Sequence, residues 1–231
     1  MVEHVLPGAP PVALTLRRSG RARRISLRIS QLDGRVTLTL PTDVRESEAL
    51  EFAASKEDWI RGHLDKRPDE MPVECGASLP IEGTAHRIVP AAGRRVVRHE
   101  GEICVPEDAA GRRLQVWLKE LARDRLVMAC DHYAGQLGRS YKRITLRDTR
   151  SRWGSCTSDG GLMFSWRLIL TPPEILRYVA AHEVAHLAEM NHSPAFWAQV
   201  ENIFGPYQQP RRWLRDNGAE LHRYRFDAKP S

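Results

Sequence analysis

Residues 171–197 read TPPEILRYVAAHEVAHLAEMNHSPAFW, and this stretch decides how the second half of the chain folds. Thr171 is a preferred helix N-cap residue, Pro172 suits the first helical turn, and Glu174 follows the cap by three positions. That arrangement is typical of a capping box. The stretch therefore predicts a helix that begins at about Pro172, ends at about Met190 and leaves through a turn.

Two histidines inside the predicted helix have the spacing of a metal site. His182 and His186 are four residues apart, so a helix places both rings on one face, about 6 Å apart along the axis. Two imidazoles in that arrangement can bind one tetrahedral Zn²⁺. Glu183 follows the first ligand and would lie beside the ion, where it can take a proton from a zinc-held water. The pattern predicts a zinc-dependent hydrolase with Glu183 as its general base.

A catalytic zinc needs a third protein ligand and one open position. His192 is the first candidate, because it comes six residues after His186 and just beyond the expected end of the helix. Glu189 competes but would be carried past the ion on a continuous helix, and Glu201 or Glu220 could serve from a later helix. A coincidental HExxH on an ordinary amphipathic helix is the alternative, and the third histidine within reach argues against it.

The preceding stretch, residues 145–170, reads TLRDTRSRWGSCTSDGGLMFSWRLIL. It predicts a hairpin from a strand at 144–146, a turn at 159–161 and a return strand at 162–168 that leads into the helix. An exposed edge of such a hairpin can pair with an extended peptide substrate. The aromatic residues of this stretch are individually more typical of a core: Trp153, Phe164 and Trp166.

The first half of the chain is predicted to be rich in strands. ARRISLRIS and GRVTLTL alternate apolar and polar residues on either side of Asp33-Gly34, the turn pair that a hairpin prefers. A helix is expected over about 44–64, with further strands near 86–89, 95–97 and 102–105. A long apolar periodicity then runs from about Gly111 to a stop at Gly138.

These elements predict an α+β protein. An N-terminal antiparallel β-rich region with one helix would occupy residues 1–108, and a catalytic domain residues 109–231. With 42% hydrophobic residues among 231, the chain can form a core. Its apolar runs are too short to span a membrane. Without an export signal, and with four cysteines that form no CxxC pair, a cytoplasmic location with free thiols is expected.

Positive charge gathers beside the predicted site. Residues 139–177 contain eight basic and three acidic side chains. The surplus is either a solubilising face or a surface for an anionic partner, such as an acidic peptide, a nucleic acid or a nucleotide. A nucleoside triphosphate pyrophosphohydrolase is therefore a second candidate function, although no GxxxxGK[ST] loop is present. A non-catalytic nucleic-acid-binding zinc module is a third, weakened because Glu183 would have no purpose there.

The motifs together resemble the YgjP-like metallopeptidase family, which is related to the WLM and SprT-type zinc proteases. The resemblance rests on RSRWGSC at 150–156, HEVAH at 182–186, NHSPAFW at 191–197 and YQQPRRWLRDNG at 207–218. It implies a gluzincin-like (zincin) core that hydrolyses peptide or protein substrates. It also implies zinc on His182, His186 and His192, with Glu183 as the base. Glu189 stands where the metzincin motif requires glycine, so the resemblance does not extend to that group.

Substrate binding is assigned less directly. The oxyanion that develops during amide hydrolysis needs a cation or a phenol near it. Arg152, Tyr207 and Arg211 are candidates, and the sequence does not choose among them. Trp153, which adjoins Arg152 in the RSRWGSC motif, is assigned to substrate binding with them.

Overall fold

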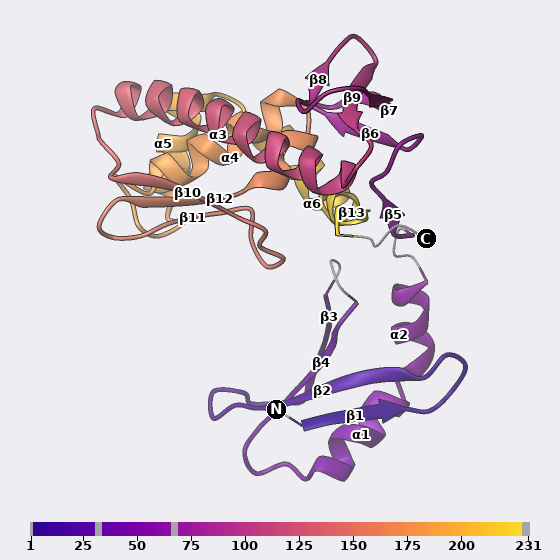
Figure 1. Cartoon of the computed structure of the whole chain (residues 1–231). Coiled ribbons are helices and arrows are strands. Elements are labelled where there is room, and N and C mark those ends of the chain that lie inside the picture. The colour runs from indigo at the N-terminus through magenta and orange to yellow at the C-terminus, as the bar shows by residue number, and fades with distance from the viewer. Residues whose placement is uncertain (1, 31–33, 66–68, 228–231) are drawn as a thin grey trace. The chain divides into compact units, whose positions relative to one another are not determined.

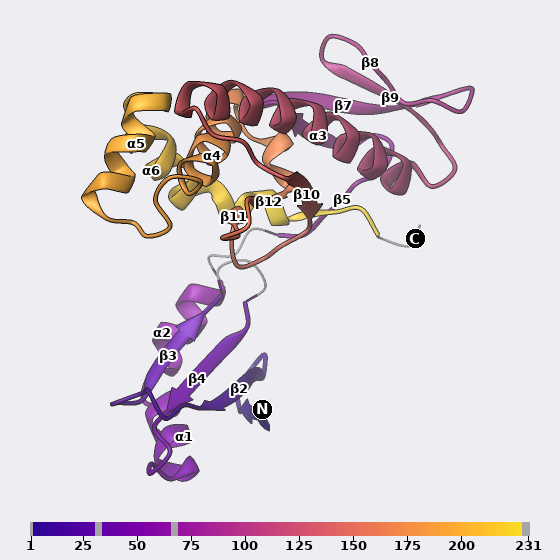
Figure 2. The same cartoon turned by 90° about the vertical axis from the view of Figure 1, so that its left-hand side faces the viewer.

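The computed structural model divides the chain into two compact units, residues 1–68 and 69–231 (Figures 1 and 2). It describes residues 2–30, 34–65 and 69–227. Within the described helices, none is long and apolar enough to cross a membrane. The mixture of small sheets and helices confirms the α+β class.

The first unit contains a four-stranded sheet in the order β1-β2-β4-β3. The strands are β1 (Val2–Leu6), β2 (Val12–Arg18), β3 (Ser26–Ile29) and β4 (Val36–Leu40). β3 and β4 pair antiparallel, as the alternating pattern predicts, and the Asp33 of the expected turn lies outside the described residues. The antiparallel pairing expected for this region is found for β1–β2 and β3–β4, whereas β2 runs parallel to β4.

The helix expected over residues 44–64 is two helices, α1 (Glu46–Ala54) and α2 (Glu57–Leu64). The break falls at Ser55, whose hydroxyl donates to the Phe52 carbonyl at 2.8 Å and so competes with the helical bonding pattern. α1 packs on β4 and α2 on β3. Their aliphatic residues close a core of their own within the first unit.

The second unit begins with strands that pack against its longest helix. β6 (Ser78–Ile81), β7 (Thr84–Ala91), β9 (Glu102–Pro106) and β8 (Val97–Arg98) form a sheet in that order, with β7 parallel to β9. β5 (Met71–Pro72) pairs with β13 (Tyr224–Arg225) near the C-terminus. Strands predicted near 86–89 and 102–105 are confirmed as β7 and β9.

Helix α3 (Ala110–Leu137) ends at Gly138, whose φ of 63° is the left-handed stop that the sequence predicts. Residues of one α3 face, including Leu114 and Leu118, share a core with Ile88 and Ile103 of the preceding sheet. This shared core explains why the units divide after residue 68, whereas the sequence predicts a boundary near 108.

A three-stranded sheet precedes the predicted metal-binding helix. Its order is β10 (Arg143–Arg147), β12 (Gly161–Ser165) and β11 (Gly154–Cys156). The predicted hairpin partners need correction, because β10 runs parallel to β12 and the antiparallel hairpin is β11–β12. α3 lies beside this sheet, and both views show the three strands side by side (Figures 1 and 2).

The return strand is also shorter than predicted. β12 ends at Ser165, and η1 (Trp166–Leu170) is a buried 3₁₀ turn. The chain leaves the strand because the Arg167 guanidinium donates to Asp148 and to the carbonyl oxygen of Leu221. The expectation that Phe164 and Trp166 belong to the core is confirmed, since both are fully buried.

Helix α4 (Pro173–Ala185) is shorter at both ends than predicted. The Thr171 hydroxyl donates to the carbonyl oxygen of Leu168 at 2.7 Å instead of capping the helix, so the capping box does not form. α4 is followed by α5 (Pro194–Phe204), α6 (Gln208–Asn217) and the 3₁₀ turn η2 (Gly218–His222). α4 packs between α3 on one side and α5 and α6 on the others.

Candidate metal centre

The end of α4 brings the histidines together. His182 lies in the last turn of the helix, and His186 is the residue at its C-cap. Tight bonds from the Leu187 and Ala188 amides to the Val184 and Ala185 carbonyls then close the chain into a turn. The helix therefore stops just after its second histidine, which lets the following residues fold back toward the first.

A second turn delivers His192. The Asn191 side-chain oxygen accepts from the Ser193 amide at 3.0 Å, and the Ser193 hydroxyl accepts from the Phe196 amide to cap α5. These two local bonds hold His192 between the turn and the new helix. The exit suggested by Asn191 thus exists, although α4 ends five residues before the predicted Met190 because the intervening residues already form a turn.

The three imidazoles form a compact group of possible ligands. One ring nitrogen from each of His182, His186 and His192 lies within 4.8 Å of the others. Nε2 of His182 and Nε2 of His192 are 3.0 Å apart. Ligands of a tetrahedral zinc lie about 2.1 Å from the ion and so about 3.4 Å from one another. The histidines therefore fit a small divalent ion that accepts nitrogen ligands.

Protonation also suits metal binding. Nδ1 of His186 lies 2.9 Å from the carbonyl oxygen of Glu189, which can only accept, so Nδ1 carries the proton and Nε2 keeps its lone pair. Burial lowers the pKa of His186, and burial together with the neighbouring imidazoles lowers the pKa of His182 to about 3. Both rings are thus neutral at physiological pH, as ligand chemistry requires.

Glu183 is a buried carboxyl beside this group. Its side chain is 6% exposed, and burial raises its pKa to about 8, with the charge of Arg152 acting in the opposite direction. Gly154 of β11 explains how the carboxyl fits, because a Cβ at that position would lie 2.5 Å from Glu183 Oε1 and Cγ. The sheet edge therefore contacts the glutamate through bare backbone.

Aromatic rings pack against the histidines, of which His186 is buried and His192 is exposed. Phe196 stacks on His186, with ring centroids 4.3 Å apart, and Trp197 stacks on His192 at 5.8 Å. Tyr207 in turn stacks on Trp197 at 4.8 Å, and the Arg211 guanidinium lies 4.6 Å from the Trp197 ring centre. Two of the residues predicted to bind substrate, Tyr207 and Arg211, are thereby placed on the wall of the histidine group.

The remaining predicted residues lie elsewhere around the site. Trp153 packs against His222, with ring centroids 5.3 Å apart, and against Gly218, so the structure uses it as packing. The competing third ligands stand apart from the group of three histidines found among the described residues. Glu189 contributes its backbone carbonyl, and Glu220 pairs with Arg223.

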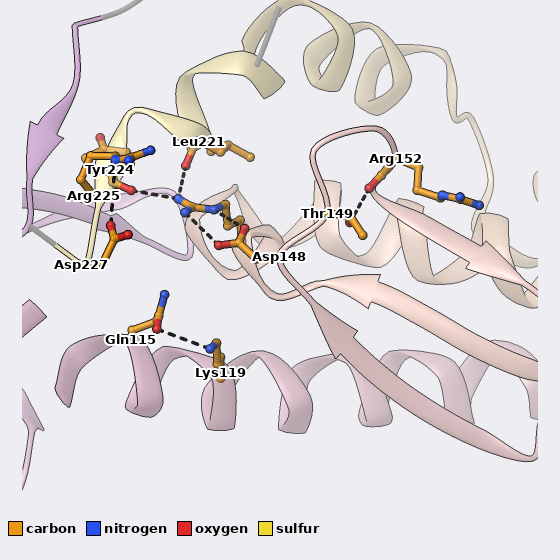
Figure 3. A network of polar contacts seen from close by, with 10 residues as sticks. Gln115, Lys119, Asp148, Thr149, Arg152, Leu221, Tyr224, Arg225 and Asp227 are labelled. Atoms are coloured by element: carbon orange, nitrogen blue, oxygen red, sulfur yellow. Dashed lines mark hydrogen bonds and ion pairs between the residues drawn. The ribbon is translucent and has the colours of Figure 1, made fainter. Parts of the chain in front are cut away.

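The loop that carries Arg152 is anchored by a polar network (Figure 3). Arg167, 7% exposed, bridges both carboxylate oxygens of Asp148 and donates to the carbonyls of Leu221 and Tyr224. The Thr149 hydroxyl donates to the Arg152 carbonyl at 2.8 Å. Figure 3 shows the Arg152 side chain pointing away from the Arg167 network.

Sequence reasoning placed Phe196 in the family motif without giving it a role, and it did not find the Arg167–Asp148 pair or the approach of Gly154 to Glu183. Only Gly154 carries a signal that could have revealed its role, because a glycine inside a strand often marks close approach of another group. The ion pair joins residues 19 positions apart, so no local pattern announces it.

Comparison with protein families decides the assignment. A family model described as "YgjP-like, metallopeptidase domain" matches residues 23–217. The chain belongs to the YgjP-like metallopeptidase family. The resemblance read from the motifs is thus confirmed, and family membership supports a hydrolase that depends on a metal and acts on peptide bonds. The match extends across both units of this YgjP-like chain.

Other comparisons show less. A comparison with curated proteins finds no match. Among solved structures, this YgjP-like chain is similar to the crystal structure of the metallopeptidase zymogen of Pyrococcus abyssi abylysin, with 21% sequence identity and a TM-score of 0.36. That similarity covers 40% of this chain and 92% of the other.

Proposed function

We propose that this protein is a zinc-dependent peptidase whose gluzincin-like catalytic domain hydrolyses peptide bonds. His182, His186 and His192 are the proposed metal ligands, and Glu183 is the proposed general base. The observation that carries the proposal is the convergence of three imidazole nitrogens within 4.8 Å, together with the burial of Glu183, which follows His182 in α4. Family membership supports the same chemistry.

The histidines are suited to hold zinc rather than to transfer protons. Two of them have lowered pKa values, and the Glu189 carbonyl fixes the orientation of the His186 ring. Zinc held there would supply the positive charge that acidifies a water molecule and polarises the substrate carbonyl. Phe196 and Trp197 pack against the rings of His186 and His192 and so help to fix their orientation.

Glu183 is suited to move the proton. Its carboxylate takes a proton from the attacking water and later gives it to the leaving amine nitrogen. A positive charge nearby favours the ionised form and so opposes the effect of burial, which alone raises the pKa of Glu183 to about 8. The backbone of Gly154 lies close to the carboxyl and limits where it can lie.

Arg211 and Tyr207 are the proposed stabilisers of the oxyanion. Both contact Trp197, which stacks on His192: the Tyr207 ring stacks on Trp197, and the Arg211 guanidinium lies over it. Arg152 approaches from the other side and acts electrostatically on Glu183. We therefore assign Arg152 to substrate binding near β11. Tyr207 and Arg211 are assigned to stabilisation of the oxyanion.

The test replaces Glu183 with glutamine. Glu183→Gln should keep about one zinc per chain, while hydrolysis of an unstructured protein falls by about 10²- to 10⁴-fold, the contribution of a positioned base. Glu174→Gln removes the same charge from an exposed position in the first turn of α4 and should change neither quantity. Unchanged hydrolysis in Glu183→Gln would remove this residue from the mechanism.

The same preparations should be incubated with nucleoside triphosphates. Release of pyrophosphate while protein substrate stays intact would favour the nucleotide-hydrolysing alternative, which stays a prediction from the sequence. A nucleic-acid mobility shift with every substrate unchanged would favour the non-catalytic zinc module. Cleavage of protein that stops on adding a chelator and returns with zinc would support the peptidase.

A further inference from the structure

The outer face of the β10-β12-β11 sheet forms a hollow of about 290 Å³, and apart from Arg152 its lining residues have no role in the proposed mechanism. The register explains which residues face it. Arg143, Thr145 and Arg147 alternate along β10, and Thr145 lies opposite Met163 of β12, which lies opposite Ser155 of β11. Intervening residues such as Ile144 and Phe164 face the core instead.

The hollow is strongly basic. Arg143, Arg147 and Arg152 line it together with five hydroxyl side chains, and no carboxylate is among the lining residues that the structure describes. None of the three guanidinium groups forms an ion pair with another described side chain. All three arginines are exposed, so the hollow keeps its full positive charge.

The carboxylates that stand closest in sequence are already bound to other groups. Asp148 holds Arg167 at 2.7 Å. Asp159 accepts from the Thr157 hydroxyl at 2.5 Å and pairs with Lys142 at 3.3 Å. The lowered pKa values of Asp148 and Asp159 agree with these partners: hydrogen bonds to Thr157 and Lys142 lower that of Asp159, and the Arg167 bond outweighs the effect of burial on Asp148. An external anion would therefore meet little competition.

The hollow adjoins the proposed reaction site through β11. This strand lies at the edge of the sheet, with β12 as its only strand neighbour among the described residues. Its Gly154 contacts Glu183 on the inner side, while the adjacent Ser155 faces the hollow. An extended peptide paired with β11 would lie about 4.8 Å from it and direct alternate side chains toward this outer face.

We propose that this hollow binds an acidic segment of the substrate, so that the enzyme selects peptides with carboxylate side chains beside the bond to be cleaved. This inference rests on the proposed peptidase function for the identity of the bound chain. Arg152 would meet the side chain closest to Glu183. Arg143 and Arg147 lie on β10, across β12 from the β11 edge, and would meet acidic side chains that reach over the outer face. Guanidinium groups suit carboxylates because they donate two parallel hydrogen bonds.

A peptide fits this surface better than a nucleic acid does. The residues that line the hollow include no aromatic ring in the described chain, whereas proteins that bind single strands stack the bases on such rings. The free backbone of the β11 edge offers hydrogen bonds in the pattern of a peptide strand. Charge and backbone pairing therefore point to the same occupant.

The test measures binding apart from turnover, in the zinc-loaded full chain carrying Glu183→Gln. Two fluorescent twelve-residue peptides serve as probes, one with glutamate and one with glutamine at alternate positions, and both with serine and alanine elsewhere. Fluorescence anisotropy should show the glutamate peptide binding about tenfold more tightly at low salt, with the difference shrinking as salt is added. Equal affinity for the two peptides overturns the proposal.

Substitutions then locate the binding. Adding Arg143→Gln with Arg147→Gln should weaken the glutamate peptide about three- to tenfold, as expected for two exposed ion pairs. The charge-preserving pair Arg143→Lys with Arg147→Lys should recover most of that loss. Arg87→Gln with Arg112→Gln removes the same charge from exposed positions on other elements and should change the affinity by less than about twofold. Circular dichroism confirms that each variant is folded.

Two outcomes contradict the assignment directly. One is an unchanged affinity in the Arg143→Gln with Arg147→Gln variant. The other is a single-stranded oligonucleotide that binds more tightly than the glutamate peptide and is lost in the same variant, which would assign the hollow to nucleic acid. Because turnover is absent from these measurements, a failed peptidase assay and a failed binding assay remain distinguishable.

Discussion

Two glutamates lie near opposite ends of helix α4, and their surroundings differ. Glu82 belongs to the β6–β7 turn at the start of the helix, where its amide donates to the Ile169 carbonyl and the adjacent Gly83 contacts Pro172. Glu183 lies in the last turn of the helix itself. Both are acidic groups on one structural frame, so their differences come from their neighbours.

The neighbours of Glu82 are cations. Arg98 and Arg125 each place a guanidinium nitrogen 2.6 Å from one of its carboxylate oxygens. Burial raises the pKa of Glu82, but the hydrogen bonds from the two arginines outweigh it and lower the pKa overall. Glu183 has no such partner among the described side chains, and burial dominates. A paired carboxylate stays ionised at neutral pH, whereas an unpaired buried one can exchange a proton.

In this unit the paired Glu82 contributes to stability, whereas the unpaired Glu183 is available for proton transfer. The Glu82 pairs join the β6–β7 turn to β8 and to α3, so the carboxylate contributes to holding the start of α4 in place. Glu183 is left without a counter-ion at a cost in folding free energy, which functional sites commonly bear.

Removing a metal ligand should have the largest effect on zinc content and peptidase activity. His186→Ala should reduce bound zinc from about one per chain to near zero, and peptidase activity should fall on the order of 10³-fold or more, because the cation that acidifies the water is lost. Elemental analysis and a protein-cleavage assay measure the two effects. His132→Ala alters an exposed ring outside the histidine group and should leave both unchanged. Full zinc content in His186→Ala would exclude this residue as a ligand.

Filling the space beside Glu183 should have the next largest effect. In Gly154→Ala the new methyl group would meet Glu183 Oε1 at 2.5 Å, so the carboxyl must move. A displacement of about 1 Å at a reacting group can cost about 10²-fold in rate, and we expect a loss of that size with zinc retained. Gly135→Ala within α3 meets nothing within 4 Å and is the matched control. Normal activity in Gly154→Ala would mean that β11 does not position the base.

Removing the charge of Glu82 should affect the free energy of unfolding more than peptidase activity. Glu82→Gln should lower the free energy of unfolding by about 1–2 kcal/mol at neutral pH, measured by urea denaturation, because two charge-assisted hydrogen bonds are lost. Glu100→Gln, at an exposed position, should have little effect. A Glu82→Gln protein that is as stable as the wild type would show that the pairs contribute nothing net.

The stability difference between the wild type and Glu82→Gln should depend on pH. Because the folded pKa of Glu82 is lowered from 4.5, its contribution is complete above that value and is lost as the pH falls through the lower, folded pKa. The stability difference between wild type and Glu82→Gln should therefore be constant near neutrality and narrow below about pH 4.5. A difference that widened on acidification would contradict this linkage.

Much of the site could be predicted from the sequence because its spacing is local. Four residues separate His182 from His186, and helical geometry alone then aligns their rings. The turn at Asn191 and the left-handed stop at Gly138 are likewise properties of single residues and their immediate neighbours. The family motifs combine such local patterns, which explains why the family was recognisable from the sequence.

Other features depended on residues that are distant in the chain. The parallel pairing of β10 with β12, the end of α4 at Ala185 and the approach of Gly154 to Glu183 required the tertiary structure. An alternating pattern reveals which side chains share a face, but it leaves open which strand will be the neighbour. Only packing between distant segments chooses the partner, and that choice brings a bare backbone glycine to the carboxyl and three arginines to one hollow.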